Sequence, residues 1–355
     1  MIKSSAQLSY KNVATYSDGA FVEIFIANRK PSNGHLETIE FYEDRPDLGE
    51  IKKLKTVPWD VMMPENAELI IAAAGKPRNQ LNSFWAAWRE QDRYSAMSIF
   101  QEKAIELKLD PAAELVYPPI ALPSKKFQQL FWQETNNTWK LSSAMFSGVL
   151  GQKGEVRVTK LTSAKTQPLV SVSAPVPAEN EDLSVVAWAE ADLKGSIASV
   201  ALIHQESLKL FSCKKVEGLF PLVPQRVGVH VNPMGLVVFG FVAFDIAQAE
   251  YKLVESYNNL ETGECEIQTE KLALAPKSVV SAGVFYYMDT DEVSKFIFVN
   301  NNKQELLSVI RGTPHLYRKD VQPDYDYPIV ATILSRYEAI MRKDKIDMTG
   351  IDSPE

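Results

Sequence analysis

The feature of the sequence that most constrains its fold is a recurring aromatic residue followed by an acid at the end of a short apolar segment. In the three clearest copies, glutamate stands two residues after tryptophan: Trp88 and Glu90, Trp132 and Glu134, Trp188 and Glu190. Weaker copies keep the same order: Tyr16 and Asp18, Phe241 and Asp245, Tyr287 and Asp289. A polar turn and a second apolar segment follow each copy, which is the pattern of a repeated β-hairpin.

The spacing of these copies predicts the architecture. The aromatic positions 16, 88, 132, 188, 241 and 287 are separated by 72, 44, 56, 53 and 46 residues. Four of the five intervals lie near the length of one four-stranded propeller blade, and the longest needs an insertion or an extra unit. A hairpin with one apolar face is unstable alone, whereas sheets stacked around an axis bury both faces.

Short segments rich in β-branched and aromatic residues, separated by turn residues, are densest in the second half of the chain. They cover residues 185–189, 198–204, 227–231, 236–243, 279–287, 295–299 and 306–310. We therefore predict an all-β fold, a β-propeller of six or seven blades. The alternative is a tandem of β-sandwiches or lipocalin-like barrels, which would use as many strands.

Two segments also fit helical spacing. In residues 85–109 a helix would place several apolar residues on one face, and it would make the repeat at Trp88 false. Residues 329–343 carry the same spacing, so we predict a C-terminal amphipathic helix. The predicted organisation is a repeat domain over 1–327, a helix over 328–346 and a polar tail over 347–355.

Charge and composition exclude some classes of partner. Lys and Arg total 38 against 45 Asp and Glu, a net charge of −7, which argues against a strongly basic nucleic-acid binder. The longest apolar run, residues 233–244, is far shorter than the ~20 residues of a membrane helix. Cys213 and Cys265 are predicted to be free thiols in a reducing compartment, and the expected location is the cytoplasm.

No motif for catalysis, a metal or a cofactor stands out. The four histidines are too far apart for a zinc helix, and we predict neither a metal nor a cofactor. Gly148, Gly151 and Gly154 precede a strand-like segment, which favours a hairpin turn over a phosphate-binding loop, since such a loop needs a helix start.

The aromatic and acid pairs are the candidate ligand-binding residues. If the strand continues through the acid, both side chains line one face, and an aromatic plate beside a carboxylate suits a sugar ring. In the alternative interpretation the strand ends at the tryptophan, the indole lies in the core and the acid caps a turn. The candidates are Trp88, Glu90, Trp132, Glu134, Trp188, Glu190, Tyr287 and Asp289.

Units of about this length, each with an apolar strand and an aromatic residue, resemble six-bladed β-propellers. Among these, the pattern is similar to the fungal fucose-binding lectins, a resemblance that implies sugar sites between blades made by arginine, glutamate and aromatic side chains. Three pairs match the aromatic and acid parts: Trp88 and Glu90, Trp132 and Glu134, Trp188 and Glu190. Arg89 and Arg93 lie beside the first pair, whereas Gln133 and Ala189 stand beside the other two.

We predict a non-enzymatic protein that binds or scaffolds a protein partner or a glycan, with no nucleic-acid partner and no insertion into a membrane. A carbohydrate-binding lectin is one alternative. The other is a propeller or barrel enzyme, a hydrolase, lyase or cyclase acting on a small molecule. A deep pocket lined by His204, His230 or several acids would favour the enzyme.

Overall fold

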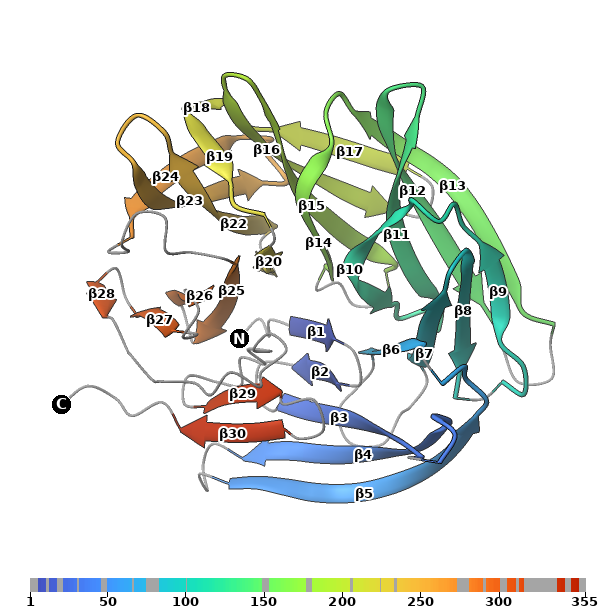
Figure 1. Ribbon diagram of the computed structural model, residues 1–355. Helices are drawn as coiled ribbons and strands as arrows, with labels where there is room; N and C mark the ends of the chain where they lie inside the picture. The colour runs from blue at the N-terminus through green and yellow to red at the C-terminus, as the bar shows by residue number, and fades with distance from the viewer. Residues whose placement is uncertain are drawn as a thin grey trace. The chain divides into compact units, whose positions relative to one another are not determined.

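The computed structural model shows that the fold is all-β, as predicted (Figure 1). Every element of the described residues is a strand, and none of them forms a helix long and apolar enough to cross a membrane. The structure describes residues 6–350 except 11–12, 18–21, 31, 46–49, 66, 75–82, 100, 149–152, 177–180, 205–206, 224, 233–234, 273–280, 290–291, 301–304, 311–312, 316–336 and 342–345.

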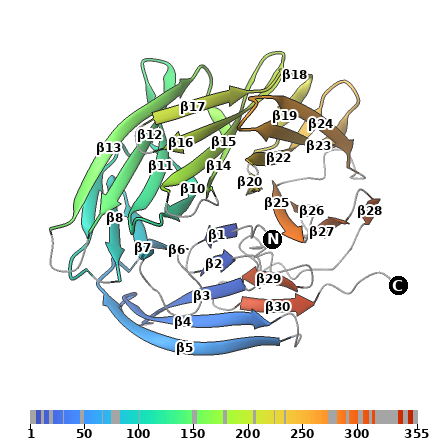
Figure 2. The same ribbon diagram turned by 180° about the vertical axis from the view of Figure 1, so that it is seen from behind.

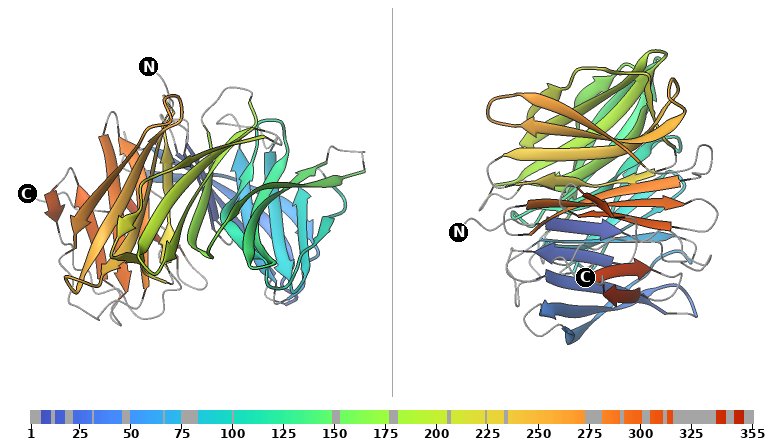
Figure 3. Two further views of the ribbon diagram at one scale, coloured as in Figure 1. Left: turned by 90° about the horizontal axis from the view of Figure 1, so that it is seen from above. Right: turned by 90° about the vertical axis from the view of Figure 1, so that its left-hand side faces the viewer.

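The chain divides into two compact units. The first contains residues 1–165, 173–185 and 202–208, and the second contains residues 166–172, 186–201 and 209–355. In both, consecutive strands form twisted antiparallel sheets, as the view from behind and the two side views show (Figures 2 and 3).

The first unit contains three runs of strands that pair in chain order, and the third run belongs to a larger sheet of nine strands. The first sheet holds β1 (Ala6–Tyr10), β2 (Val13–Ser17), β3 (Val22–Arg29), β4 (Leu36–Arg45) and β5 (Glu50–Val61). The second holds β6 (Glu68–Ala74), β7 (Ser83–Glu90), β8 (Arg93–Ser98) and β9 (Ile105–Lys108). The third run holds β10 (Glu114–Ala121), β11 (Phe127–Thr135), β12 (Thr138–Ser147) and β13 (Glu155–Ala164).

The remaining strands follow the same scheme. A fourth run holds β14 (Pro168–Pro175), β15 (Leu183–Asp192), β16 (Gly195–His204) and β17 (Ser207–Ser212). A short strand, β18 (Val216–Glu217), pairs with β16. The division into two units passes through this run. In the second unit, β19 (Leu219–Pro221), β22 (Leu236–Asp245), β23 (Glu250–Asn259) and β24 (Cys265–Lys271) pair in that order, with β21 (Val229–Val231) also on β22. The next sheet holds β20 (Gln225–Val227), β25 (Ser281–Asp289), β26 (Glu292–Asn300), β27 (Glu305–Ile310) and β28 (Thr313–His315).

All six aromatic positions of the predicted repeat lie in the second strand of such a run. They are Tyr16 in β2, Trp88 in β7, Trp132 in β11, Trp188 in β15, Phe241 in β22 and Tyr287 in β25. The helical alternative for residues 85–109 is wrong, because β7, β8 and β9 occupy that segment. The longest interval of the repeat contains the fifth strand of the first sheet, β5. The number of blades and the single repeat domain over 1–327 stay predictions.

The predicted C-terminal helix over 328–346 is not confirmed. Its described part, Tyr337–Met341, is β29, which pairs antiparallel with β30 (Ile346–Gly350). The rest of the helix range lies outside the described residues, as does most of the predicted tail. A short apolar segment fits both periods, so pairing with a neighbouring strand can override helical spacing.

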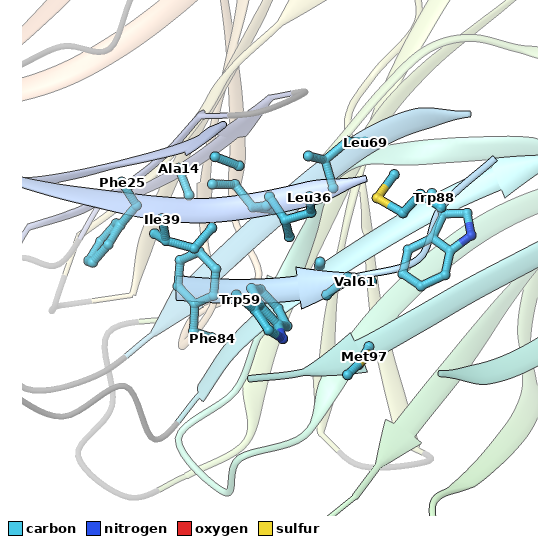
Figure 4. Close-up of a cluster of buried hydrophobic side chains, with 14 of the residues drawn as sticks. Ala14, Phe25, Leu36, Ile39, Trp59, Val61, Leu69, Phe84, Trp88 and Met97 are labelled. Carbon is cyan, nitrogen blue, oxygen red and sulfur yellow. The ribbon is translucent and has the colours of Figure 1, made fainter. Parts of the chain in front are cut away.

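Aromatic side chains fill the core between the first and second sheets (Figure 4). The ring centroid of Phe84 lies 5.6 Å from that of Phe25 and 5.7 Å from that of Trp59. Trp88 belongs to the same core, whereas Trp85 lies in the core between the second and third sheets. Because successive residues of a strand face opposite sides, β7 is covered by large side chains on both faces.

The prediction of two free thiols is wrong in this structure, because Cys213 and Cys265 form a disulfide bond. Their Cα atoms lie 5.4 Å apart although 52 positions separate them in the sequence. Cys213 follows β17, and Cys265 begins β24. The turn before β24 is also held by Lys209, whose Nζ donates to the carbonyl oxygen of Leu260 at 3.1 Å. Sequence spacing does not reveal such proximity, since it arises only when the sheets pack.

We expect the double variant Cys213→Ser/Cys265→Ser to lose about 4 kcal/mol of unfolding free energy, because the bond closes a long loop and restricts the unfolded chain. Urea unfolding of the variant and of the oxidised protein measures this difference. Reduction of the native protein should give the same loss. Equal midpoints for the oxidised and reduced protein would contradict the expectation.

Candidate functional site

The first unit contains an open cleft of about 960 Å³ beside the hairpin of β12 and β13. We call it the β12–β13 cleft. Its lining residues come from the start of β11, from the two hairpin strands and from the approach to β15. They are Lys126, Ser143, Met145, Ser147, Glu155, Val156, Arg157, Val158, Thr159 and Asp182.

The pairing of β12 with β13 explains the polar surface of the cleft. Three directly opposite pairs lie on one face of the hairpin: Ser143 and Thr159, Met145 and Arg157, Ser147 and Glu155. The alternate β12 residues Ala144 and Phe146 point to the other face and are buried in the core shared with the second sheet. The alternation therefore places polar groups in the cleft without interrupting the core.

Asp182 fixes one wall of the cleft. Its carboxylate accepts hydrogen bonds from the backbone N–H of Ser124, at 3.1 Å, and from the Ser124 hydroxyl. The Nζ atom of Lys126 lies 3.7 Å from the same carboxylate. The turn between β10 and β11 is closed by the N–H of Leu122, which donates to the carbonyl oxygen of Lys126 at 2.8 Å. This wall is held by a residue distant in the sequence and is positioned before any ligand arrives.

A chain of hydrogen bonds supports the floor. The hydroxyl of Ser184 donates to Oε1 of Gln128 at 2.6 Å, and Nε2 of Gln128 donates to Oγ of Ser143 at 3.0 Å. All three residues are buried, and Ser143 reaches the cleft with only 2% of its surface exposed. Buried polar groups with their partners in place are rigid, so the Ser143 hydroxyl is held at a fixed point of the floor.

The predicted tryptophans lie elsewhere, in the cores. Trp88, Trp132 and Trp188 are 5%, 1% and 2% exposed, so no indole presents an open stacking surface. None of the three lines the cleft.

The acids that follow them are at or near the turns. Glu90 and Glu134 are exposed, and Glu190 is partly buried. Oε2 of Glu190 accepts hydrogen bonds from the N–H and hydroxyl of Thr166, at 3.2 and 3.0 Å. The expectation that the strands end at the tryptophans is wrong, because β7 ends at Glu90, β11 at Thr135 and β15 at Asp192. The indoles lie in the core, as the structural interpretation expected, and ligand binding by the pairs stays a prediction. Tyr287 and Asp289 lie at the end of β25, but the structure does not describe their side chains.

Sequence reasoning missed the residues that line the cleft. A period of two in Ser143–Ser147 and Glu155–Thr159 is the signal that could have found the hairpin strands. Ser147 pairs with Glu155, so β12 and β13 form a hairpin, while residues 149–152 of the predicted turn at Gly148–Gly154 lie outside the described residues. Nothing local in the sequence connects Asp182 to this hairpin.

A buried acid in the second unit has a structural role. Tyr286 donates its hydroxyl to Oε1 of Glu255 at 3.0 Å, and both residues are buried. Burial raises the pKa of Tyr286 well above its usual value. A Cβ atom at Gly240 would lie 1.9 Å from the Tyr286 hydroxyl oxygen, so the glycine leaves the room that this contact needs.

The two histidines considered for an enzyme site do not line the cleft. His204 is exposed at the end of β16, and His230 is buried in β21 with 6% of its surface exposed. Desolvation lowers the pKa of His230 to about 4. Among the residues that the structure describes, no group of three or more His, Cys, Asp or Glu side chains could hold a metal ion.

His230 should make the folded protein sensitive to acid. In the unfolded chain histidine takes up its proton near pH 6.5, whereas the folded protein resists protonation until about pH 4. The unfolded state therefore binds more protons in this window, and stability falls as the pH falls from about 6.5 to about 4, by about 3 kcal/mol. We expect His230→Gln to remove this part of the pH dependence in urea unfolding. The exposed control His204→Gln should keep it, and an unchanged slope in His230→Gln would contradict the assignment.

No protein-family model matches the chain, and no curated protein matches its sequence. Similar solved structures include AofleA from Arthrobotrys oligospora, with a TM-score of 0.47 and 14% identity over 90% of this chain and 88% of that one. The polysaccharide lyase Uly1 has a TM-score of 0.47 and 9% identity over 94% and 88% of the two chains. A fungal lectin from Aleuria aurantia, described as a six-bladed β-propeller, has a TM-score of 0.39 and 8% identity over 90% and 98%.

Proposed function

We propose that this chain is a non-enzymatic binding protein that takes a saccharide in the β12–β13 cleft. The observation that carries the proposal is the preformed set of polar groups around the cleft, above all the Ser143 hydroxyl and the Asp182 carboxylate, each held by buried or backbone partners. A site whose groups are already in place loses little conformational freedom on binding.

The chemistry of the lining suits a sugar. Met145 gives the cleft an apolar side chain, while serine and threonine hydroxyls, two carboxylates and two cations give donors and acceptors. A sugar ring has an apolar face and a rim of hydroxyls that both donate and accept hydrogen bonds. The volume of about 960 Å³ falls within the range of roughly 300–1,000 Å³ that is usual for ligand pockets.

The disulfide bond bears on where the protein works. A bond between Cys213 and Cys265 persists in an oxidising environment, whereas cytoplasmic thiols are kept reduced. We therefore place the protein in an oxidising compartment in this proposal, in preference to the cytoplasm that was predicted from the sequence.

A glycan array followed by titration calorimetry tests the binding role, with a matched pair of variants. Thr159, opposite Ser143 on the cleft face of the hairpin, lines the cleft, and Leu54, 43% exposed in β5, does not. We expect Thr159→Arg to weaken binding roughly tenfold or more, a loss of about 1.4 kcal/mol, by filling the cleft with a long side chain. Leu54→Arg should bind like the native protein.

Two outcomes would contradict the proposal. One is that no saccharide binds, or that Thr159→Arg binds as tightly as Leu54→Arg. The other is turnover: prolonged incubation should return the bound saccharide unchanged by mass spectrometry, and a cleaved or unsaturated product would show an enzyme.

A further inference from the structure

Among the residues that the structure describes, none accepts a hydrogen bond from the Ser143 hydroxyl. Its oxygen accepts a hydrogen bond from Nε2 of Gln128, and this is its hydrogen-bond partner among the residues that the structure describes. A serine hydroxyl can also donate one hydrogen bond. Because Ser143 is buried and yet lines the cleft, its hydrogen is available to an acceptor placed in the cleft.

The orientation of the Gln128 amide determines that Ser143 accepts a hydrogen bond from it. Its Oε1 atom accepts from Ser184, so its Nε2 atom is the group that faces Ser143. Ser184, Gln128 and Ser143 thus donate in one direction, each to the next, toward the cleft. A buried donor left without an acceptor costs free energy, so the floor favours a ligand that presents an acceptor oxygen at this point.

Two cations lie close to this donor. Arg157 is paired with Met145, so it is a diagonal neighbour of Ser143, and such neighbours lie roughly 7–8 Å apart, within reach of a long side chain. Lys126 lines the same cleft and forms an ion pair with Asp182 at 3.7 Å, and its ammonium group has three N–H donors, of which a ligand can take one. The Asp182 carboxylate faces Lys126 and Ser124, and Glu155 lies farther along the hairpin, opposite Ser147.

We infer that the β12–β13 cleft recognises a carboxylate on its saccharide, so that the ligand contains uronic acid units. The Ser143 hydroxyl donates to a carboxylate oxygen, and Arg157 and Lys126 supply the opposite charge. This inference rests on the proposed saccharide-binding role. Hydrogen bonds between such donors and an ionised acceptor are about twice as strong as those between neutral groups.

The test compares oligogalacturonate with its methyl ester, which has the same length and shape but no charge, by titration calorimetry on the full chain. We expect the acid to bind at least roughly tenfold more tightly than the ester. The preference should shrink as salt rises from about 50 to about 500 mM, because salt screens exposed charges.

Paired variants then locate the carboxylate. Ser143→Ala should weaken binding of the acid roughly tenfold, while Ser142→Ala, one residue along β12 on the opposite face, should leave it unchanged. Arg157→Gln, at an exposed position that does not depend on the buried floor, should remove most of the preference for acid over ester. If Ser143→Ala does not fold, the Arg157→Gln variant provides the test.

The outcomes separate this inference from the proposed function. If acid and ester bind equally and Thr159→Arg weakens both, the carboxylate inference is overturned and the saccharide site is kept. Unchanged affinity in folded Ser143→Ala, or an unchanged preference in Arg157→Gln, would also overturn it. Binding of a glutamate-rich peptide without any saccharide would overturn both.

Discussion

The structure depends on aromatic side chains buried between sheets that pack face to face. Phe84 and Trp85 are consecutive in β7, and they fill the cores on opposite sides of the second sheet. Each such side chain buries roughly 150–250 Å², so neither face of β7 can be left in water. A strand with this pattern needs a neighbouring sheet on both sides, and the sheets of the first unit follow one another for that reason.

This packing also determines where a ligand can bind. The inner strands are covered on both faces, so polar groups within them, such as Gln128 and Gln129, are buried with hydrogen-bond partners, while Glu90 and Glu134 are exposed near strand ends. In the third run the outer strand β13 is less covered: most of its residues are exposed or partly exposed, and Ala164 is its buried residue. The cleft forms on this outer hairpin, where one face still packs on the core and the other does not.

Strands and the repeated motif could be predicted from the sequence because they are local patterns. Contacts between distant segments of the folded chain could not. The β-branched runs identified the strands, and the motif placed Trp88 and Trp132 in strands that are followed by a turn and a returning strand, as β7–β8 and β11–β12 are. The spacing could not say which face each indole takes, because a shift of one residue reverses the face. The disulfide and the contacts of Asp182 join distant segments, so no local pattern carries them.

Trp132, one residue of the tryptophan motif, lies on the same sheet face as the cleft. The motif is therefore near the site, although its indole does not line it. Along the ladder of β11 and β12, Trp132 pairs with Leu141, Leu130 with Ser143, and Gln128 with Met145. These side chains share a face, and their character changes from fully apolar at the indole to polar toward the cleft. Burial is therefore graded along one face: the end with Trp132 anchors the sheet in its core, and the end with Ser143 remains open to a ligand.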